Sequence, residues 1–197
     1  MTGYRIGRIF GIEVHIHGSW LIIGGLILWT FAARVLPIDF PDAGLALRLV
    51  MATAITLLFF ISLLAHELAH SVVAMARGIP VRRITFFLFG GMAQTSTDSR
   101  SAGEEFVIAI AGPVMSFLLA GLFFAIWYPG SGPDPGAASD PAGWGLAVTG
   151  IAFYMMYLNT LLGAFNLLPG FPMDGGRVLR AVIWKVTGSV TRATEWA

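Results

Sequence analysis

Four apolar stretches, each long enough to cross a lipid bilayer, limit what this chain can fold into. They cover residues 18–36, 45–75, 106–128 and 144–168. A membrane helix needs about 20 mainly apolar residues. Only 12% of the residues are charged, whereas a soluble domain has about 25%. We therefore expect an all-α polytopic membrane protein with about four transmembrane helices in a single unit over residues 1–197.

The connections between the apolar stretches differ in character. Residues 37–44 are short and acidic, and residues 128–143 are rich in Pro, Gly and Asp, which is typical of a solvent-facing loop. In residues 78–105, β-branched and aromatic residues flank Gly90-Gly91. This pattern predicts a β-hairpin at about 81–95, and its many phenylalanines indicate that the hairpin is associated with the membrane.

Arginine is distributed unequally between the two sides that four crossing helices would create. One side holds Arg5, Arg8, Arg77, Arg82, Arg83, Arg100, Arg177 and Arg180. The other side holds Arg34 and Arg48 together with Asp39, Asp42, Asp134 and Asp140. The positive-inside rule places the arginine-rich side in the cytosol. We expect an integral protein of the plasma (cell inner) membrane.

Two histidines and a glutamate lie in "AHELAH" (65–70), near the cytosolic end of the second stretch. On a helix, His66 and His70 project from one face and can bind the same metal ion. In this H-E-x-x-H arrangement two imidazoles bind zinc and the glutamate, here Glu67, acts as general base. The alternative is a set of buried, hydrogen-bonded polar residues. It is disfavoured because each ionisable group at mid-membrane costs about 2.5–3.5 kcal/mol, which a divalent cation offsets.

A third ligand is needed, because catalytic zinc sites have three protein ligands and an open position. The chain contains no cysteine, so the ligand must be a histidine or a carboxylate. Asp174 follows the fourth stretch, in "FNLLPGFPMDGGR" (165–177). The prolines and glycines there predict a re-entrant loop at 166–177, and irregular backbone at membrane depth is tolerated around a site. A turn with a capping aspartate is the alternative.

These motifs resemble the site-2 protease family of intramembrane zinc metalloproteases, in the branch with C-terminal cystathionine-β-synthase-type domains. "GIEVHIHGSW", "FGGMAQ" and "AGPVMS" add to the resemblance. It implies one zinc ion per chain, with His66, His70 and Asp174 as ligands and Glu67 as catalytic base. Asn166, Pro169 and Gly175 match the family's Asn-x-x-Pro…Asp-Gly pattern. Where the family often has asparagine, this chain has Ser116. The branch usually continues beyond this point, so we expect the native C-terminal region to be absent.

The resemblance implies hydrolysis of peptide bonds in or near transmembrane segments. Expected substrates are single-span membrane proteins, such as anti-sigma factors or transcription-factor precursors, and the lipid bilayer is the other partner. A net charge of +1 gives no reason to expect a nucleic-acid partner, and a homo-oligomer is left open. The alternatives are a divalent-metal transporter and an inactive metal-binding membrane scaffold.

Three further features are less specific. Asn166 or a backbone amide is a candidate to stabilise the oxyanion. Asn159 could contact substrate or form an interhelical hydrogen bond. The hairpin edge could bind substrate as an added strand, or the hairpin could be a hydrophobic plug. We expect His15 and His17 to be interfacial, with Trp20 in the aromatic belt; the alternative is that the two histidines line the water path or cap the site.

Overall fold

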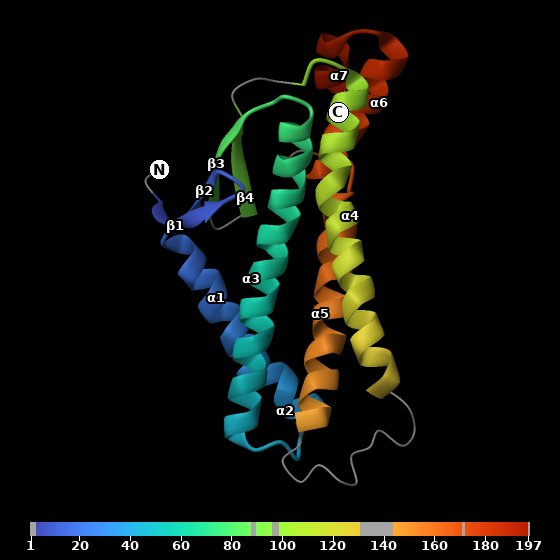
Figure 1. Cartoon of the computed structure of the whole chain (residues 1–197). Coiled ribbons are helices and arrows are strands. Elements are labelled where there is room, and N and C mark those ends of the chain that lie inside the picture. Colours follow the sequence, from blue (N-terminus) through green and yellow to red (C-terminus); the bar gives the residue numbers. More distant parts are fainter. Residues whose placement is uncertain (1–2, 88–89, 96–98, 131–143, 171, 197) are drawn as a thin grey trace.

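The computed structural model describes residues 3–87, 90–95, 99–130, 144–170 and 172–196. Four helical segments are long and apolar enough to cross a membrane: Ser19–Asp39, Leu45–Ala76, Ala102–Trp127 and Trp144–Asn166. They form an elongated bundle in which successive segments run in opposite directions (Figure 1). The predicted fold class is confirmed: this is an integral membrane protein built mainly from helices.

The first membrane segment is not a uniform helix. It consists of α1 (Ser19–Thr30), a π-helical turn η1 (Phe31–Val35) and α2 (Leu36–Asp39). Pro37 lacks the N–H that would bond to the carbonyl four residues earlier, so the regular ladder is interrupted here. Phe31 packs edge-on against Tyr154 at 5.0 Å between ring centroids. The Tyr154 hydroxyl also donates a hydrogen bond to the Asp39 carboxylate, which ties this segment to the fourth one.

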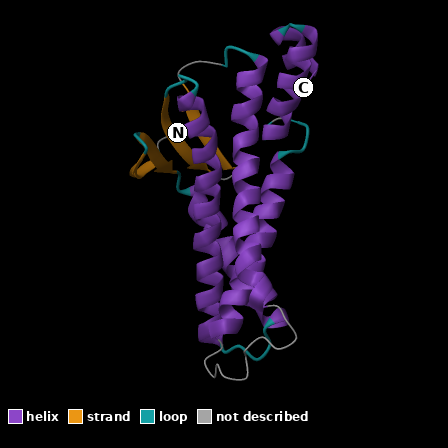
Figure 2. Cartoon of the chain, turned by 45° about the vertical axis from the view of Figure 1, so that its right-hand side comes forward, coloured by secondary structure: helices purple, strands orange, loops and turns teal. Residues whose placement is uncertain are grey.

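A four-stranded sheet lies beside the helices at one end of the bundle (Figure 2). Its strands, β1 (Tyr4–Ile9), β2 (Ile12–Ile16), β3 (Val81–Phe87) and β4 (Gly90–Thr95), are in the order β1-β2-β3-β4. The expected hairpin corresponds to β3 and β4. The hairpin β1–β2 was not predicted; its turn has positive φ at Phe10 and Gly11, as a two-residue type I′ turn requires. Strands β2 and β3 pair in parallel.

The sheet is anchored on α1 and α3 (Leu45–Ala76) through an apolar cluster that includes Ile12, Val14, Ile84 and Phe86. The Trp20 ring stacks on Phe60 and Phe86, at 4.0 Å and 5.1 Å between centroids. Trp20 is therefore buried, at 9% exposure, and our placement of it in an aromatic belt was wrong. Its contact with Phe86 of β3 helps to join the sheet to the bundle.

The remaining helices are α4 (Ala102–Trp127), α5 (Trp144–Asn166), α6 (Asp174–Thr187) and α7 (Val190–Trp196), with a short 3-10 turn, η2 (Tyr128–Gly130), after α4. Ser101 caps α4 by accepting a hydrogen bond from the Glu104 amide. The loop between α5 and α6 is shorter than we expected. Asn166 still belongs to α5 and Asp174 already begins α6, so the irregular part that the structure describes is 167–170 and 172–173.

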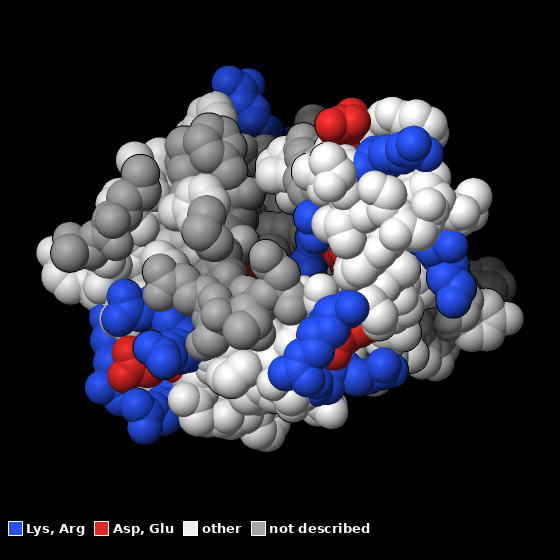
Figure 3. Space-filling view, turned by 90° about the horizontal axis from the view of Figure 1, so that it is seen from above, with Lys and Arg blue, Asp and Glu red and all other residues white. Residues whose placement is uncertain are grey.

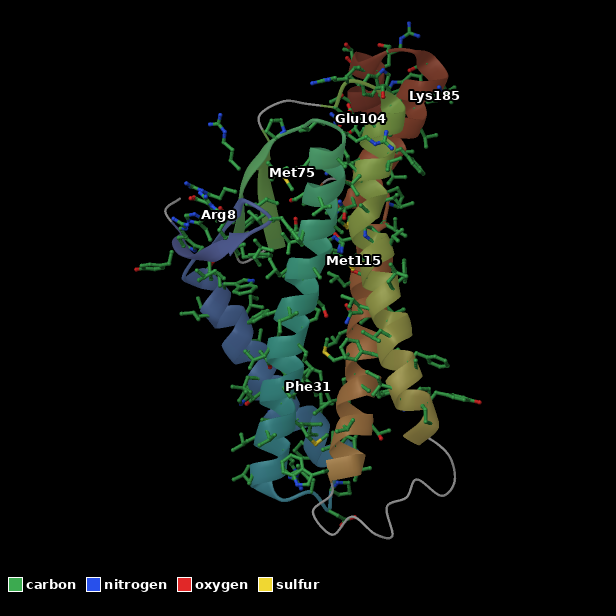
Figure 4. All side chains as sticks on the ribbon, viewed as in Figure 1. Arg8, Phe31, Met75, Glu104, Met115 and Lys185 are labelled. Carbon is green, nitrogen blue, oxygen red and sulfur yellow. The ribbon has the colours of Figure 1, made fainter. Side chains whose placement is uncertain are left out.

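The two ends of the molecule differ in charge. Arg8, Glu104 and Lys185 lie toward the end that carries the sheet and α6, whereas Phe31 lies far toward the other end (Figure 4). Seen from the sheet end, Lys and Arg predominate among the charged side chains in view, and one such group lies beside a hollow (Figure 3). Lys and Arg side chains therefore gather at this end of the molecule, as the arginine distribution in the sequence predicts.

Candidate metal centre

Three side chains from two distant parts of the chain converge inside the bundle. His66 Nε2 and His70 Nε2, both on α3, each lie 3.1 Å from Asp174 Oδ2 at the start of α6. The two imidazole nitrogens are 3.2 Å apart. His66 and His70 are buried, with 2% and 7% exposure. Helix α3 aligns the histidines because they are one turn apart, and α6 brings the carboxylate to them.

The outer nitrogens of both imidazoles are held by α4. His70 Nδ1 donates to the Ile108 carbonyl at 2.7 Å. A carbonyl only accepts, so Nδ1 carries a proton, and in the neutral imidazole the Nε2 lone pair then points inward. His66 Nδ1 lies 2.9 Å from Ser116 Oγ, which can accept in the same way. The centre thus gathers electron-rich atoms, an arrangement that a cation stabilises.

The spacing of these atoms suits a small tetrahedral ion. Ligands about 2.0–2.1 Å from a tetrahedral zinc ion lie roughly 3.3 Å from one another, close to the separations of 3.1–3.2 Å found here. His66, His70 and Asp174 together form a possible metal-binding site. With three protein ligands, a fourth position stays open for water or substrate, as in catalytic zinc sites.

The charge state of Asp174 agrees with this role. Asp174 lies beyond the last membrane-spanning helix, and its burial alone would raise the pKa of its carboxyl group. The interactions with the imidazoles of His66 and His70 outweigh burial and hold this pKa well below its usual range. Asp174 is therefore an anion at neutral pH and can balance part of the charge of a divalent ion.

Gly112 on α4 lets that helix approach the two imidazoles. A Cβ atom at this position would lie 2.1 Å from His70 Nε2 and 2.6 Å from His66 Nε2. It would occupy the space in which the ligand atoms meet. Glycine is thus required here for close approach.

Glu67 lies against the β-hairpin. A Cβ atom on Gly91 in β4 would come within 2.6 Å of both Cγ and Cδ of Glu67. A side chain at position 91 would therefore have to displace the Glu67 carboxylate. The hairpin therefore reaches the same site as the helices.

The two candidate asparagines belong to α5. The Asn166 amide group donates to Leu162 O at 2.8 Å, at the end of α5. Asn159 is fully buried and donates to Met155 O on its own helix, while its Oδ1 has no partner among the described residues. An interhelical hydrogen bond from Asn159 is thus not formed within the described part of the chain.

The loop residues have structural positions. Pro169 lies in the bend between α5 and α6. A Cβ atom on Gly175 would lie 2.2 Å from the Leu168 carbonyl oxygen and 2.3 Å from that of Leu167, so glycine lets the loop fold tightly onto α6. His15 and His17 do not join the centre: His15 bonds to Glu13 and Gly3, and His17 contacts Ser19 at the start of α1.

Sequence reasoning missed the parts of the site that act through backbone or through a missing side chain. The Ile108 carbonyl, Gly112 and Gly91 carry no chemical signature of their own. The glycines in "AGP" and "FGG" were the available signals, because a glycine inside an apolar helix or a strand indicates close approach. Ser116 was noted, but its contact with His66 was not predicted.

The sequence matches Peptidase family M50 over residues 54–140 and 137–196. It is 36% identical over 188 residues to sll0528 of Synechocystis sp. and 37% identical over 188 residues to Rip3 of Mycobacterium tuberculosis. The alignments cover 94% and 95% of this chain but 45% of each relative, so the chain spans less than half the length of these curated relatives.

A solved structure is also similar. The Site-2 Protease from Methanocaldococcus jannaschii matches with a TM-score of 0.58 and 27% sequence identity, over 93% of this chain and 73% of that one. The family match runs from residue 54 to residue 196 and so includes both histidines, Glu67 and Asp174. On the extent of that match, the chain belongs to peptidase family M50.

Proposed function

We propose that this protein is an intramembrane zinc metalloprotease that hydrolyses peptide bonds in or near the transmembrane segments of other membrane proteins. His66, His70 and Asp174 bind one zinc ion, and Glu67 is the catalytic base. The observation that carries the proposal is the convergence of two Nε2 atoms and one carboxylate oxygen at 3.1–3.2 Å, one residue away from a glutamate.

Bound zinc would supply Lewis acidity, which polarises a carbonyl group and makes water more acidic. Glu67 takes a proton from water and later delivers it to the leaving amine. The Asn166 amide group is the candidate donor to the oxyanion, and Asn159 is a candidate contact for the substrate backbone. The low polarity around α3 strengthens each of these electrostatic interactions.

The hairpin supports a mode of substrate binding. Strand β4 is at the edge of the sheet, and its Gly91 lies against Glu67. A peptide that adds to β4 as a further strand would run past the catalytic carboxylate in extended form. A helical substrate must unwind to do this, because a helix uses its own carbonyl groups in internal hydrogen bonds.

We also propose the substrates of this protein, the membrane in which it lies and its orientation there. The substrates are single-span membrane proteins, such as anti-sigma factors or transcription-factor precursors. The membrane is the plasma (cell inner) membrane, and the arginine-rich end with its hollow faces the cytosol, from which water enters. The motifs favour the branch with C-terminal cystathionine-β-synthase-type domains, and a homo-oligomer is compatible with them. The 197 residues form one metalloprotease core.

Zinc content of the purified protein is the first test. Elemental mass spectrometry should give about one zinc ion per chain in wild type and in His17→Ala, the control histidine outside the site. His66→Ala and Asp174→Ala should lose most of it. Retention of zinc by Asp174→Ala would overturn the three-ligand site.

Cleavage of a single-span reporter protein in lipid vesicles is the second test. Glu67→Gln should keep its zinc and lose cleavage, because the amide cannot take the proton. Full activity of Glu67→Gln would refute its role as base. Zinc transport into vesicles without cleavage would favour a transporter, although no second group of metal-ligating side chains lies along the described part of the helices.

A further inference from the structure

One stripe of α4 carries most of the contacts that hold the metal centre. It consists of Glu105, Ile108, Gly112 and Ser116, whose spacing places them on one helix face. All four are buried. Ile108 fixes His70, Ser116 fixes His66, and Gly112 gives both imidazoles their space.

Glu105 is the member of this stripe that contacts neither histidine. It is 1% exposed, and its Oε1 accepts a hydrogen bond from Arg180 Nε at 2.8 Å and a second one from the guanidinium nitrogen Nη2 of Arg180. Arg180 belongs to α6, the helix that begins with Asp174. The stripe therefore contacts all three elements of the site: two histidines directly and the aspartate through its helix.

The position of Asp174 depends on where α6 sits along α4. Asp174 is the first residue of α6, and its cap residue Met173 provides no side-chain hydrogen bond. Arg180 is six residues later, roughly 9 Å along the helix axis. Helix α6 packs along α4, and the Glu105–Arg180 pair is the ion pair between them in the described part of the chain. Apolar packing alone leaves a helix free to slide or rotate slightly, whereas a buried guanidinium–carboxylate contact fixes its register.

We propose that Glu105 and Arg180 are positioning residues that set the place of the Asp174 carboxylate relative to the two histidines. Metal–ligand distances tolerate errors of only about 0.2 Å, so a small shift of α6 weakens the third ligand. The proposal rests on the metal site proposed above, and it adds a role for two residues outside that site.

An ion pair that only stabilises the fold can be told apart from one that positions Asp174 by replacing both of its partners. Removing one partner leaves a buried charge and destabilises the fold, whereas replacing both with apolar residues is often neutral for stability. The double variant Glu105→Leu/Arg180→Met therefore removes the ion pair without leaving an unpaired buried charge. Arg8→Met/Glu13→Leu is the control, because Arg8 and Glu13 form an ion pair on the sheet.

The experiment measures Co²⁺ binding to the full purified chain by chelator competition, with the visible spectrum of the bound ion as a second readout. We expect the double variant to bind Co²⁺ about 10–100-fold more weakly, as when groups that orient ligands are lost. Its spectrum should change, while the melting temperature of the metal-free protein stays near that of wild type. The control should bind Co²⁺ as wild type does.

Unchanged affinity and spectrum in a folded double variant would overturn the proposal. If the double variant does not fold, Arg180→Lys takes its place, because lysine keeps the charge but not the planar two-donor group. Weaker binding by Arg180→Lys then supports positioning, and wild-type binding refutes it. Failure of wild type itself to bind Co²⁺ would instead contradict the metal site, so the two proposals fail separately.

Discussion

Gly112→Ala tests the metal centre most directly, because it adds one methyl group at a defined place. The new Cβ atom would lie 2.1 Å from His70 Nε2, whereas real Cβ contacts are essentially never below 3.0 Å. The helix and the imidazole must therefore separate by about 1 Å, several times the tolerance of about 0.2 Å in metal–ligand distances. The other imidazole, on His66, meets the same methyl group at 2.6 Å.

The expected loss of affinity is large. Disturbing groups that only orient a ligand costs 10–100-fold in metal affinity, and Gly112→Ala displaces the ligands themselves. We expect at least about 100-fold weaker binding, which corresponds to about 2.8 kcal/mol. Cleavage should fall with metal occupancy.

Gly121→Ala is the matched control on the same helix. A Cβ atom there meets nothing within 4 Å, so the variant should bind metal normally. Both variants gain a residue with higher helix propensity, worth about 0.5–1 kcal/mol. Chelator competition with Co²⁺ measures the affinities, and thermal unfolding of the metal-free proteins checks the fold. Equal Co²⁺ affinity of Gly112→Ala and Gly121→Ala would refute the geometry of the site.

Further variants test the surroundings of the site. Ser116→Ala removes the partner of an imidazole nitrogen, so metal affinity measured by the same competition should drop about 10–100-fold; no drop would mean that the hydroxyl does not orient the ring. Gly91→Ala should lower kcat in the reporter assay with metal content unchanged, because its Cβ displaces Glu67. Gly7→Ala is the control: its Cβ meets open space, so neither kcat nor metal content should change. On the sheet, a hydrogen bond from His15 and then the nearby arginines hold the pKa of Glu13 below its ordinary 4.5. Because the pKa of Glu13 is lower in the folded state, the ionised carboxylate stabilises the fold above pH 4.5. This stabilisation is lost as the pH falls through the pKa of Glu13 in the folded protein. Wild type should therefore lose more thermal stability than Glu13→Gln between pH 5 and pH 3; parallel curves would contradict this.

Much of the site followed from local sequence because its residues carry strong chemical signatures. His66 and His70 lie one helical turn apart, so their common direction needs no tertiary information. Asp174 had to be matched to them across more than a hundred residues. Only its place in a Pro/Gly-rich segment and the family resemblance pointed to it. The structure brings its carboxylate to 3.1 Å from both imidazoles.

The N-terminal strands show where local reasoning stops. Residues 4–16 are too short and mixed for a clear alternation, and their strand partner β3 begins at Val81. Parallel pairing between β2 and β3 depends on α1 and α3 returning the chain to the same end of the bundle. For the same reason Trp20 was misplaced: its stacking partners, Phe60 and Phe86, come from other elements.

The sequence by itself determined the membrane class, the four spans and the metal-binding chemistry, because hydrophobic length and residue type act locally. Tertiary structure alone decided how α4 supports the centre. The contacts of Ile108, Gly112 and Glu105 involve a backbone carbonyl, an absent side chain and an ion pair to α6. Such contacts depend on helix packing at ångström accuracy, and packing is fixed by all the helices together rather than by any one segment.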